Sequence, residues 1–340
     1  MITKIMKADE PGVVESAAEV IRAGGLVAIP TETVYGLGAD GLNESAVAKI
    51  FEAKGRPQDN PLILHISDAS QLESFCEDVP PVAYELAEQF WPGPLTLVLK
   101  CRDNVPKRTT AGLNTVAIRC PDNTITRAII SAAGVPIAAP SGNLSGRPSP
   151  TTAQHMIEDM SGRIDLIVDG GSCGIGVEST ILDLTVSPPR LLRPGGMPLE
   201  SLEKIVGHVA VDEALLRPLS AGERPKAPGM KYRHYAPKAP VTVLTGSADK
   251  TAVYIAQHAP LGAGVICFDD FSNAFPGRVI QTIGRSGDLL SNAQRVFDAL
   301  RAFDSTDVME IYAQCPDETG LGLAVANRLK KAAGFHVISL

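Results

Sequence analysis

Two polar stretches combine residue types that could bind a polyphosphate. The first, residues 54–61, reads Lys-Gly-Arg-Pro-Gln-Asp-Asn-Pro and brings Lys54 and Arg56 to a tight turn. The second, residues 140–147, reads Pro-Ser-Gly-Asn-Leu-Ser-Gly-Arg and is a glycine-broken loop with small hydroxyl and amide side chains. Cations supply charge to a phosphate, and backbone N–H groups and hydroxyls supply directional donors. The two stretches together indicate a nucleotide site.

Neither of the usual phosphate-binding motifs accounts for this site. The P-loop pattern and the dinucleotide pattern Gly-x-Gly-x-x-Gly do not occur at a strand–helix junction in that role. A structural alternative is that Lys54 only neutralises a helix C-terminus and that Ser141 and Asn143 only form turns. We favour the ligand site, because loops at strand ends are where α/β folds bind ligands.

Other polar side chains interrupt apolar runs. Arg119 ends the run 115–119, and it is a surface arginine, an interior partner of Asp122, or a clamp for a substrate carboxylate. His65 lies inside the run 62–66, where a satisfied core histidine is the commoner role. The spacing of His, Asp and Glu suggests no metal site made by the protein, and no nucleophile set is evident. The expected chemistry is therefore positioning and charge neutralisation.

The elements that must position these residues follow an α/β pattern. Helices are expected over 13–23 and 44–53, and the N-terminal strands over 26–30, 62–66, 95–99, 115–119, 136–139, 166–169, 179–184 and 190–193. From residue 241 strands (241–244, 264–268, 308–312) alternate with helices (248–258, 288–303, 321–333). This alternation predicts a smaller, doubly wound parallel sheet of the Rossmann-like kind. The uncharged residues 128–146 contain two prolines and three glycines, which indicates a helix end, a strand and a loop.

The segment between the two patterns differs in composition. Residues 217–240 hold five prolines and six basic residues against one acid. Such a segment is either a stiff interdomain linker or a linker that also closes over an anionic ligand. We therefore expect a catalytic domain over 1–212, a basic linker or lid over 213–240, and a second domain over 241–340.

The composition excludes several classes of protein. The net charge of −7 argues against broad electrostatic binding to nucleic acid. The six cysteines include no C-x-x-C pair, which predicts free thiols in a reducing cytoplasm and no zinc knuckle. The N-terminal residues lack the apolar core of a signal peptide. A cytoplasmic protein without a membrane span is expected.

The motifs in combination closely resemble the YrdC-like threonylcarbamoyl-AMP synthases in their longer, two-domain form. The matching stretches begin at Pro30 (PTETVYGLG), Lys54 (KGRP), Trp91 (WPGPLT), Pro140 (PSGNLSG), Glu178 (ESTI), Leu192 (LRPG) and Gly229 (GMKYRHYAP). They run in family order, and the C-terminal sequence GLGLA also resembles the longer form's second domain. One departure is Gly142, where the family usually has alanine.

The resemblance implies a reaction and its partners. L-threonine, bicarbonate or CO2, and ATP with Mg2+ would give L-threonylcarbamoyl-AMP and pyrophosphate. Other proteins would then use this intermediate to form N6-threonylcarbamoyladenosine in tRNAs that read codons starting with A. Direct binding of tRNA by this chain is expected to be weak or absent.

The resemblance also implies site residues. The catalytic residues of the family match Lys54, Arg56, Ser141 and Asn143. The threonine contacts match Thr33, His65, Arg119, Ala139 and Ser179. The ATP contacts match Arg56, Asn60, Thr115, Ser141, Ser149, Arg193 and Tyr235. The family's linker folds back over the active site, which favours a lid in this chain.

Two other functions compete with the synthase. The basic linker favours a non-catalytic RNA-binding module, but the net charge and the lack of an aromatic stacking platform argue against it. A carbamoyl transferase of the kind that matures hydrogenases would need additional zinc-finger modules, and the cysteine spacing does not provide them.

Overall fold

The described chain divides into two compact units. The computed structural model describes residues 2–215, 217 and 235–340. The first unit comprises Met1–Ser145, Pro150–Gly174 and Glu178–Lys231, and the second comprises Gly146–Ser149, Ile175–Val177 and Tyr232–Leu340. Most of the expected linker or lid over 213–240 lies outside the described residues.

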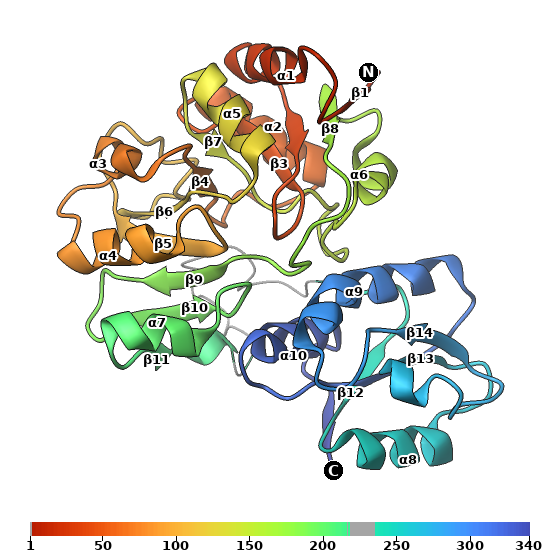
Figure 1. The fold of residues 1–340 in the computed structure, drawn as a ribbon. Helices are drawn as coiled ribbons and strands as arrows, with labels where there is room; N and C mark the ends of the chain where they lie inside the picture. The colour runs from red at the N-terminus through yellow and green to blue at the C-terminus, as the bar shows by residue number, and fades with distance from the viewer. Residues whose placement is uncertain (1, 216, 218–234) are drawn as a thin grey trace. The chain divides into compact units, whose positions relative to one another are not determined.

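The first unit is built on a mixed sheet of eleven strands with helices around it (Figure 1). Its strands are β1 (Lys4–Lys7), β2 (Val27–Ile29), β3 (Gly36–Asp40), β4 (Ile63–His65), β5 (Leu95–Lys100), β6 (Thr115–Arg119), β7 (Ile137–Ala138), β8 (Leu166–Asp169), β9 (Thr180–Asp183), β10 (Arg190–Arg193) and β11 (Ala210–Val211). Its α-helices are α1 (Val13–Arg22), α2 (Glu44–Lys54), α3 (Leu72–Phe75), α4 (Pro81–Phe90), α5 (Thr124–Ala133), α6 (Ala153–Met160) and α7 (Leu199–Val206).

The strand order is β1-β8-β2-β3-β7-β4-β6-β5-β9-β10-β11, with both parallel and antiparallel pairs. Helices α1 and α5 pack side by side over one part of this sheet (Figure 1). Their apolar faces bury Ala17, Ile21 and Ile129 against strands β2 and β8. Burial of each isoleucine contributes about 1.5–3 kcal/mol. This packing fixes strand β2, after which the chain turns at residues 31–34.

Two central strands, β3 and β7, lie close together at a glycine. A Cβ at Gly38 in β3 would lie 2.7 Å from Cγ2 of Ile137 in β7. The expectation for residues 31–38 did not include strand β3, because its sequence Gly-Leu-Gly-Ala-Asp lacks the β-branched residues that signal a strand. Glycine here serves the close contact between strands rather than strand propensity.

The second unit contains a five-stranded sheet whose strand pairs are all parallel. Its strands are β12 (Val241–Thr245), β13 (Gly264–Cys267), β14 (Val279–Thr282), β15 (Ile311–Gln314) and β16 (Val337–Ser339), in the order β14-β13-β15-β12-β16. Helix α8 (Ala248–His258) lies on one face, and α9 (Leu289–Ala302) and α10 (Leu321–Ala332) lie on the other (Figure 1). The expected doubly wound fold is confirmed.

Three strand positions in the second unit differ from the expectation. Strand β15 starts at Ile311 rather than 308, because its pairing with β12 begins at Val241 opposite Ile311. Strands β14 and β16 were not expected. Both are edge strands whose residues are half-buried or exposed, so their sequences lack a strong apolar signal.

The structure also bears on the cysteines and on the length of the helices. All six cysteines are free thiols, as the spacing predicted. Within the described ranges, every helix is too short or too polar to cross a bilayer.

Candidate active site

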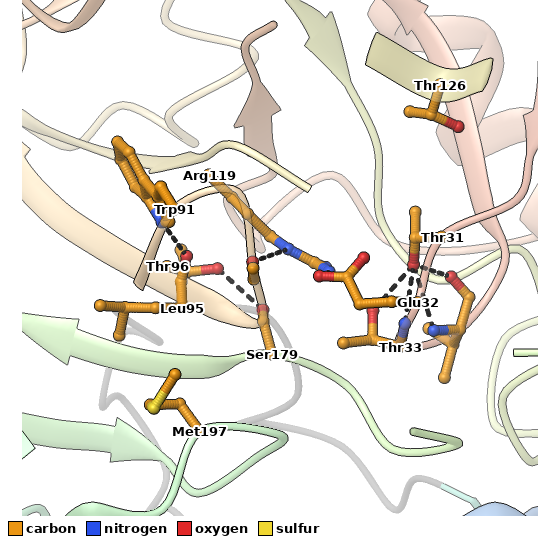
Figure 2. A network of polar contacts seen from close by, with 12 residues as sticks. Thr31, Glu32, Thr33, Trp91, Leu95, Thr96, Arg119, Thr126, Ser179 and Met197 are labelled. Atoms are coloured by element: carbon orange, nitrogen blue, oxygen red, sulfur yellow. Dashed lines mark hydrogen bonds and ion pairs between the residues drawn. The ribbon is translucent and has the colours of Figure 1, made fainter. Parts of the chain in front are cut away.

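The turn at residues 31–34 is fixed by one threonine hydroxyl. The Oγ1 of Thr31 donates to the carbonyl of Val34 at 2.6 Å and accepts from the backbone N–H groups of Thr33 and Val34 at 3.2 and 3.3 Å. It also lies 2.8 Å from the Oγ1 of Thr33. Thr126 in α5 holds the preceding residue by donating to the carbonyl of Pro30. The turn therefore presents Glu32 in a fixed direction (Figure 2).

Glu32 pairs with Arg119 at the end of β6. The Nη2 of Arg119 lies 2.7 Å from the Oε1 of Glu32. The Glu32 side chain is 13% exposed and the Arg119 side chain is 4% exposed. The Nε of Arg119 donates to the carbonyl of Gly93 at 3.3 Å. The arginine is therefore interior rather than on the surface, and its carboxylate partner is Glu32 instead of Asp122. The sequence reading missed Glu32, although its place between two threonines before a strand was a visible signal.

His65 lies beside Arg119 and is held neutral. The two residues are register partners in the parallel pair β4–β6. Burial lowers the pKa of His65 from 6.5 to about 3, and the nearby positive charge of Arg119 adds to this shift. A neutral imidazole can donate one hydrogen bond and accept another. His65 is thus suited to contact a polar group without adding charge.

Ser179 lies between Thr96 and Arg193 and contacts both of their side chains. The hydroxyl of Ser179 lies 2.7 Å from that of Thr96 in β5. The Nε and Nη2 of Arg193 donate to the backbone carbonyl and the hydroxyl of Ser179 at 3.0 and 3.1 Å. All three side chains are buried. One expected threonine contact and one expected ATP contact are therefore directly hydrogen-bonded to each other.

The loop at 140–147 is held by Lys54. The Nζ of Lys54, at the last position of α2, donates to the carbonyls of Ser141 and Asn143. The hydroxyl of Ser141 donates to the Oδ1 of Asn143 at 2.6 Å. Asn43 caps the start of α2, and Gly55 ends it in the left-handed region at φ 61°. Three of the four expected catalytic residues thus form one contact group.

The remaining predicted residues of the first unit occupy separate positions. The guanidinium carbon of Arg56 lies 5.9 Å from the centroid of the Phe51 ring. Asn60 is fully buried, and Thr115 is half-buried at the start of β6. Ala139 follows β7 and donates its backbone N–H to Ile63 at 3.0 Å.

Two predicted ATP contacts belong to the second unit. Ser149 is fully buried within the short segment Gly146–Ser149. Tyr235 is buried, with its ring centroid 5.1 Å from that of Phe297 and 5.5 Å from the guanidinium carbon of Arg328. Tyr235 has a positive φ of 64°, which is uncommon for a residue other than glycine.

The first unit therefore carries two polar groups along its central strands. His65 is opposite Ile137 at the start of β7, whereas loop 140–147 leaves after Ala138 at the end of β7. The turn that carries Glu32 lies next to this loop, because the backbone carbonyl of Tyr35 accepts from the N–H of Gly142 and Gly36 forms a bridge with Ser141. Among the described residues, no three His, Cys, Asp or Glu side chains come together as metal ligands.

Fold and site together define an α/β protein with a buried arginine–carboxylate pair and with a polar loop, held by a lysine, next to the turn that carries the carboxylate. Residues 19–195 match the Sua5/YciO/YrdC family, described as "Telomere recombination". Residues 197–334 match the family described as "Threonylcarbamoyl-AMP synthase, C-terminal domain".

Similar proteins are known over the full length of the chain. The threonylcarbamoyl-AMP synthase of Bacillus subtilis is 47% identical over 99% of this chain and 97% of its own length. The one of Pyrococcus abyssi is 48% identical over 100% of this chain and 99% of its own. The crystal structure of P. abyssi Sua5 in complex with L-threonine superimposes with a TM-score of 0.94, at 46% identity and complete coverage of both chains.

The chain belongs to the threonylcarbamoyl-AMP synthase family, in its form with a YrdC-like domain and a Sua5 C-terminal domain. The expected family, enzyme class and α/β fold are confirmed.

Proposed function

We propose that this chain joins L-threonine, bicarbonate or CO2, and ATP into L-threonylcarbamoyl-AMP and pyrophosphate, the first step of N6-threonylcarbamoyladenosine formation in tRNA. The observation that supports this most is the likeness over the whole chain to synthases of the same name. The P. abyssi structure that holds L-threonine adds the substrate class.

The threonine site is proposed around Arg119. A guanidinium can bind a carboxylate through two parallel hydrogen bonds, and Arg119 is buried where such a bond is strongest. The hydroxyls of Thr33 and Ser179 and the neutral ring of His65 offer uncharged polar contacts for the rest of the amino acid. Ala139 would contribute its backbone. All five residues belong to the first unit.

The ATP site is proposed along loop 140–147. Lys54 shapes the loop through the two carbonyls that it binds, so that Ser141 and Asn143 keep a fixed geometry. Arg56 and Arg193 would neutralise phosphate charge, and Asn60, Thr115, Ser149 and Tyr235 would complete the nucleotide contacts. Donors and cations fixed before the reaction stabilise the developing charge without reorganisation.

The residues would act on the reaction by binding and orienting its parts. The amine of threonine adds to the carbon of CO2 and loses a proton, or adds to the carbon of bicarbonate with loss of water; either gives a carbamate. A carbamate oxygen then attacks the α-phosphorus of ATP, and pyrophosphate leaves. Lys54, Arg56 and Arg193 would stabilise the negative charge on the phosphate oxygens. Holding the reactants in line contributes on the order of several kcal/mol.

Mg2+ is proposed as part of the ATP substrate rather than as an ion held by the protein. The side chains around the proposed phosphate site are cations, amides and hydroxyls, which suit the phosphates better than a divalent cation. When bound, Mg2+ would neutralise phosphate charge.

The catalytic domain is proposed to span 1–212, with 213–240 as a lid that keeps water from the carbamate and 241–340 as a second domain.

The downstream partners follow from the product. Its mixed anhydride is reactive, so a transfer protein acting on tRNA must accept it soon after release. A cytoplasmic location, where tRNA and ATP are available, fits this use.

The experiment that tests the function is an assay of pyrophosphate release from MgATP, with each co-substrate left out in turn. We expect release that needs both L-threonine and bicarbonate, and that falls by about 100-fold in Arg56→Ala. The matched control is Arg163→Ala, which removes an exposed arginine and should keep full activity. Release that is independent of threonine would contradict the proposal.

A further inference from the structure

The ion pair between Glu32 and Arg119 has unfilled hydrogen-bonding capacity. Both carboxylate oxygens of Glu32 and the Nη2 of Arg119 are buried, and within residues 2–215, 217 and 235–340 they have no hydrogen-bond partner. The Nη2 of Arg119 and the Oε1 of Glu32 are 2.7 Å apart and form an ion pair, but their geometry is not that of a hydrogen bond. Buried charged groups are normally hydrogen-bonded as well as paired, because their desolvation is costly. This pair is therefore incomplete without a further polar group.

The turn that carries Glu32 directs it into the polar cluster. The hydrogen bonds of Thr31 fix residues 31–34, and Figure 2 shows the Glu32 carboxylate facing the guanidinium of Arg119. The neighbouring groups Thr33, Thr96 and Ser179 carry hydroxyls, and His65 is neutral because its pKa is lowered to about 3. Glu32 supplies the negative charge of this cluster.

A buried cation beside a buried anion matches a zwitterion. In an α-amino acid, the ammonium and carboxylate groups are attached to the same carbon. A ligand whose carboxylate binds Arg119 thus places its ammonium within reach of a carboxylate that contacts the same guanidinium. Each of the protein's charges would then gain the hydrogen bonds that it lacks.

We propose that Glu32 binds the α-ammonium group of the amino-acid substrate while Arg119 binds its α-carboxylate. This rests on the function proposed above. Glu32 makes the site selective for α-amino acids over hydroxy acids, and it holds the nitrogen that becomes part of the carbamate. Arg119 makes the site selective for the free acid over the amino-acid amide. In the absence of substrate, Glu32 and Arg119 neutralise each other.

The test is calorimetric binding to the full-length protein with two ligands. L-threonine carries both charges, and (R)-3-hydroxybutanoate keeps the carboxylate and hydroxyl but lacks the amine. In Glu32→Gln, which keeps the shape and removes the charge, we expect the Kd for L-threonine to rise about tenfold or more. The Kd for (R)-3-hydroxybutanoate, measured into the millimolar range, should stay the same or fall, because the variant removes a negative charge that pairs with Arg119.

Two further variants separate binding from structure. Glu32→Asp keeps the charge on a shorter side chain and should recover part of the threonine affinity. Glu19→Gln, on the exposed face of α1, should behave like the unmodified protein. Unchanged binding of ATP reports that each variant is folded.

Three outcomes would overturn the proposal. Equal weakening of both ligands in Glu32→Gln would assign Glu32 a structural role only. Tighter binding of L-threonine would mean that Glu32 competes with the substrate carboxylate for Arg119. Unchanged affinity would mean that the ammonium lies elsewhere. If the unmodified protein makes product but Glu32→Gln binds threonine normally, this inference fails and the proposed function stands. If the unmodified protein itself binds no threonine, the proposed function fails.

Discussion

At the scale of single residues, burial decides which groups in the site are charged. Arg119 and Glu32 form an ion pair with a contact of 2.7 Å. His65, on the strand that pairs with the strand of Arg119, stays neutral because burial and the charge of Arg119 both oppose protonation. A site with one cation, one anion and one neutral imidazole can discriminate ligands by charge as well as by shape.

The depressed pKa of His65 makes a prediction about stability. Below pH 6.5 the unfolded chain takes up a proton at this histidine, whereas the folded protein does so only near its pKa of about 3. Stability from a neutral His65 is therefore present above pH 6.5 and is lost as the pH falls toward 3. In His65→Asn, the pH dependence of the free energy of unfolding near pH 5 should be shallower by about 1.4 kcal/mol per pH unit. Urea unfolding between pH 4.5 and 7 measures this, and identical slopes in both proteins would contradict it.

Gly142 is a second position where a single residue can be tested. A Cβ at this glycine would lie 2.3 Å from the Sδ of Met156. Gly142→Ala should therefore lower the free energy of unfolding by about 1 kcal/mol, because the added methyl overpacks a filled site. The combination with Met156→Ala should be less destabilising than the sum of the two single changes. Gly174→Ala is the matched control, since a Cβ there meets nothing within 4 Å, and urea unfolding measures all four proteins.

At the scale of elements, helix α2 places Lys54 of the proposed phosphate site at its C-terminal end. The sequence predicted this helix over 44–53, and the structure has it over Glu44–Lys54. The side chain of Asn43 accepts hydrogen bonds from the backbone N–H groups of Ser45 and Ala46, which fixes the start. The lysine that holds loop 140–147 is thus positioned by a cap eleven residues earlier in the chain.

Removing this cap should weaken the helix and the loop together. In Asn43→Ala, the free energy of unfolding should fall by about 1 kcal/mol, whereas Asn43→Asp should be close to neutral, because Asp also caps helices. Chemical denaturation measures both. A loss in Asn43→Asp as large as that in Asn43→Ala would show that the amide acts other than as a cap.

The elements also show where a single sequence is informative. Long apolar runs with clear stops, such as those of α1, β5 and β6, were predicted within one residue at each end. Strand β3 was missed because its glycines serve a close contact with β7 that is 100 residues away. The partner of Arg119 was missed for the same reason, since Glu32 and Arg119 meet only once the sheet has formed. Contacts between distant segments depend on topology, which local patterns do not encode.

At the scale of the whole molecule, the net charge of −7 bears on the relation to tRNA. Non-specific binding to nucleic acid requires Lys and Arg that neutralise several phosphates. We therefore expect the protein to bind unmodified tRNA with a Kd weaker than about 10 μM at physiological salt. Filter binding at several salt concentrations measures this. A submicromolar Kd with a steep salt dependence would instead support the RNA-binding alternative.

The central claim is that one chain builds a carbamate of threonine and joins it to AMP. The most direct measurement is mass spectrometry of the product formed from MgATP, L-threonine and 13C-bicarbonate. The account predicts an AMP conjugate that contains threonine and one 13C atom, together with pyrophosphate. An adenylate of threonine without the labelled carbon, or no conjugate at all, would contradict it.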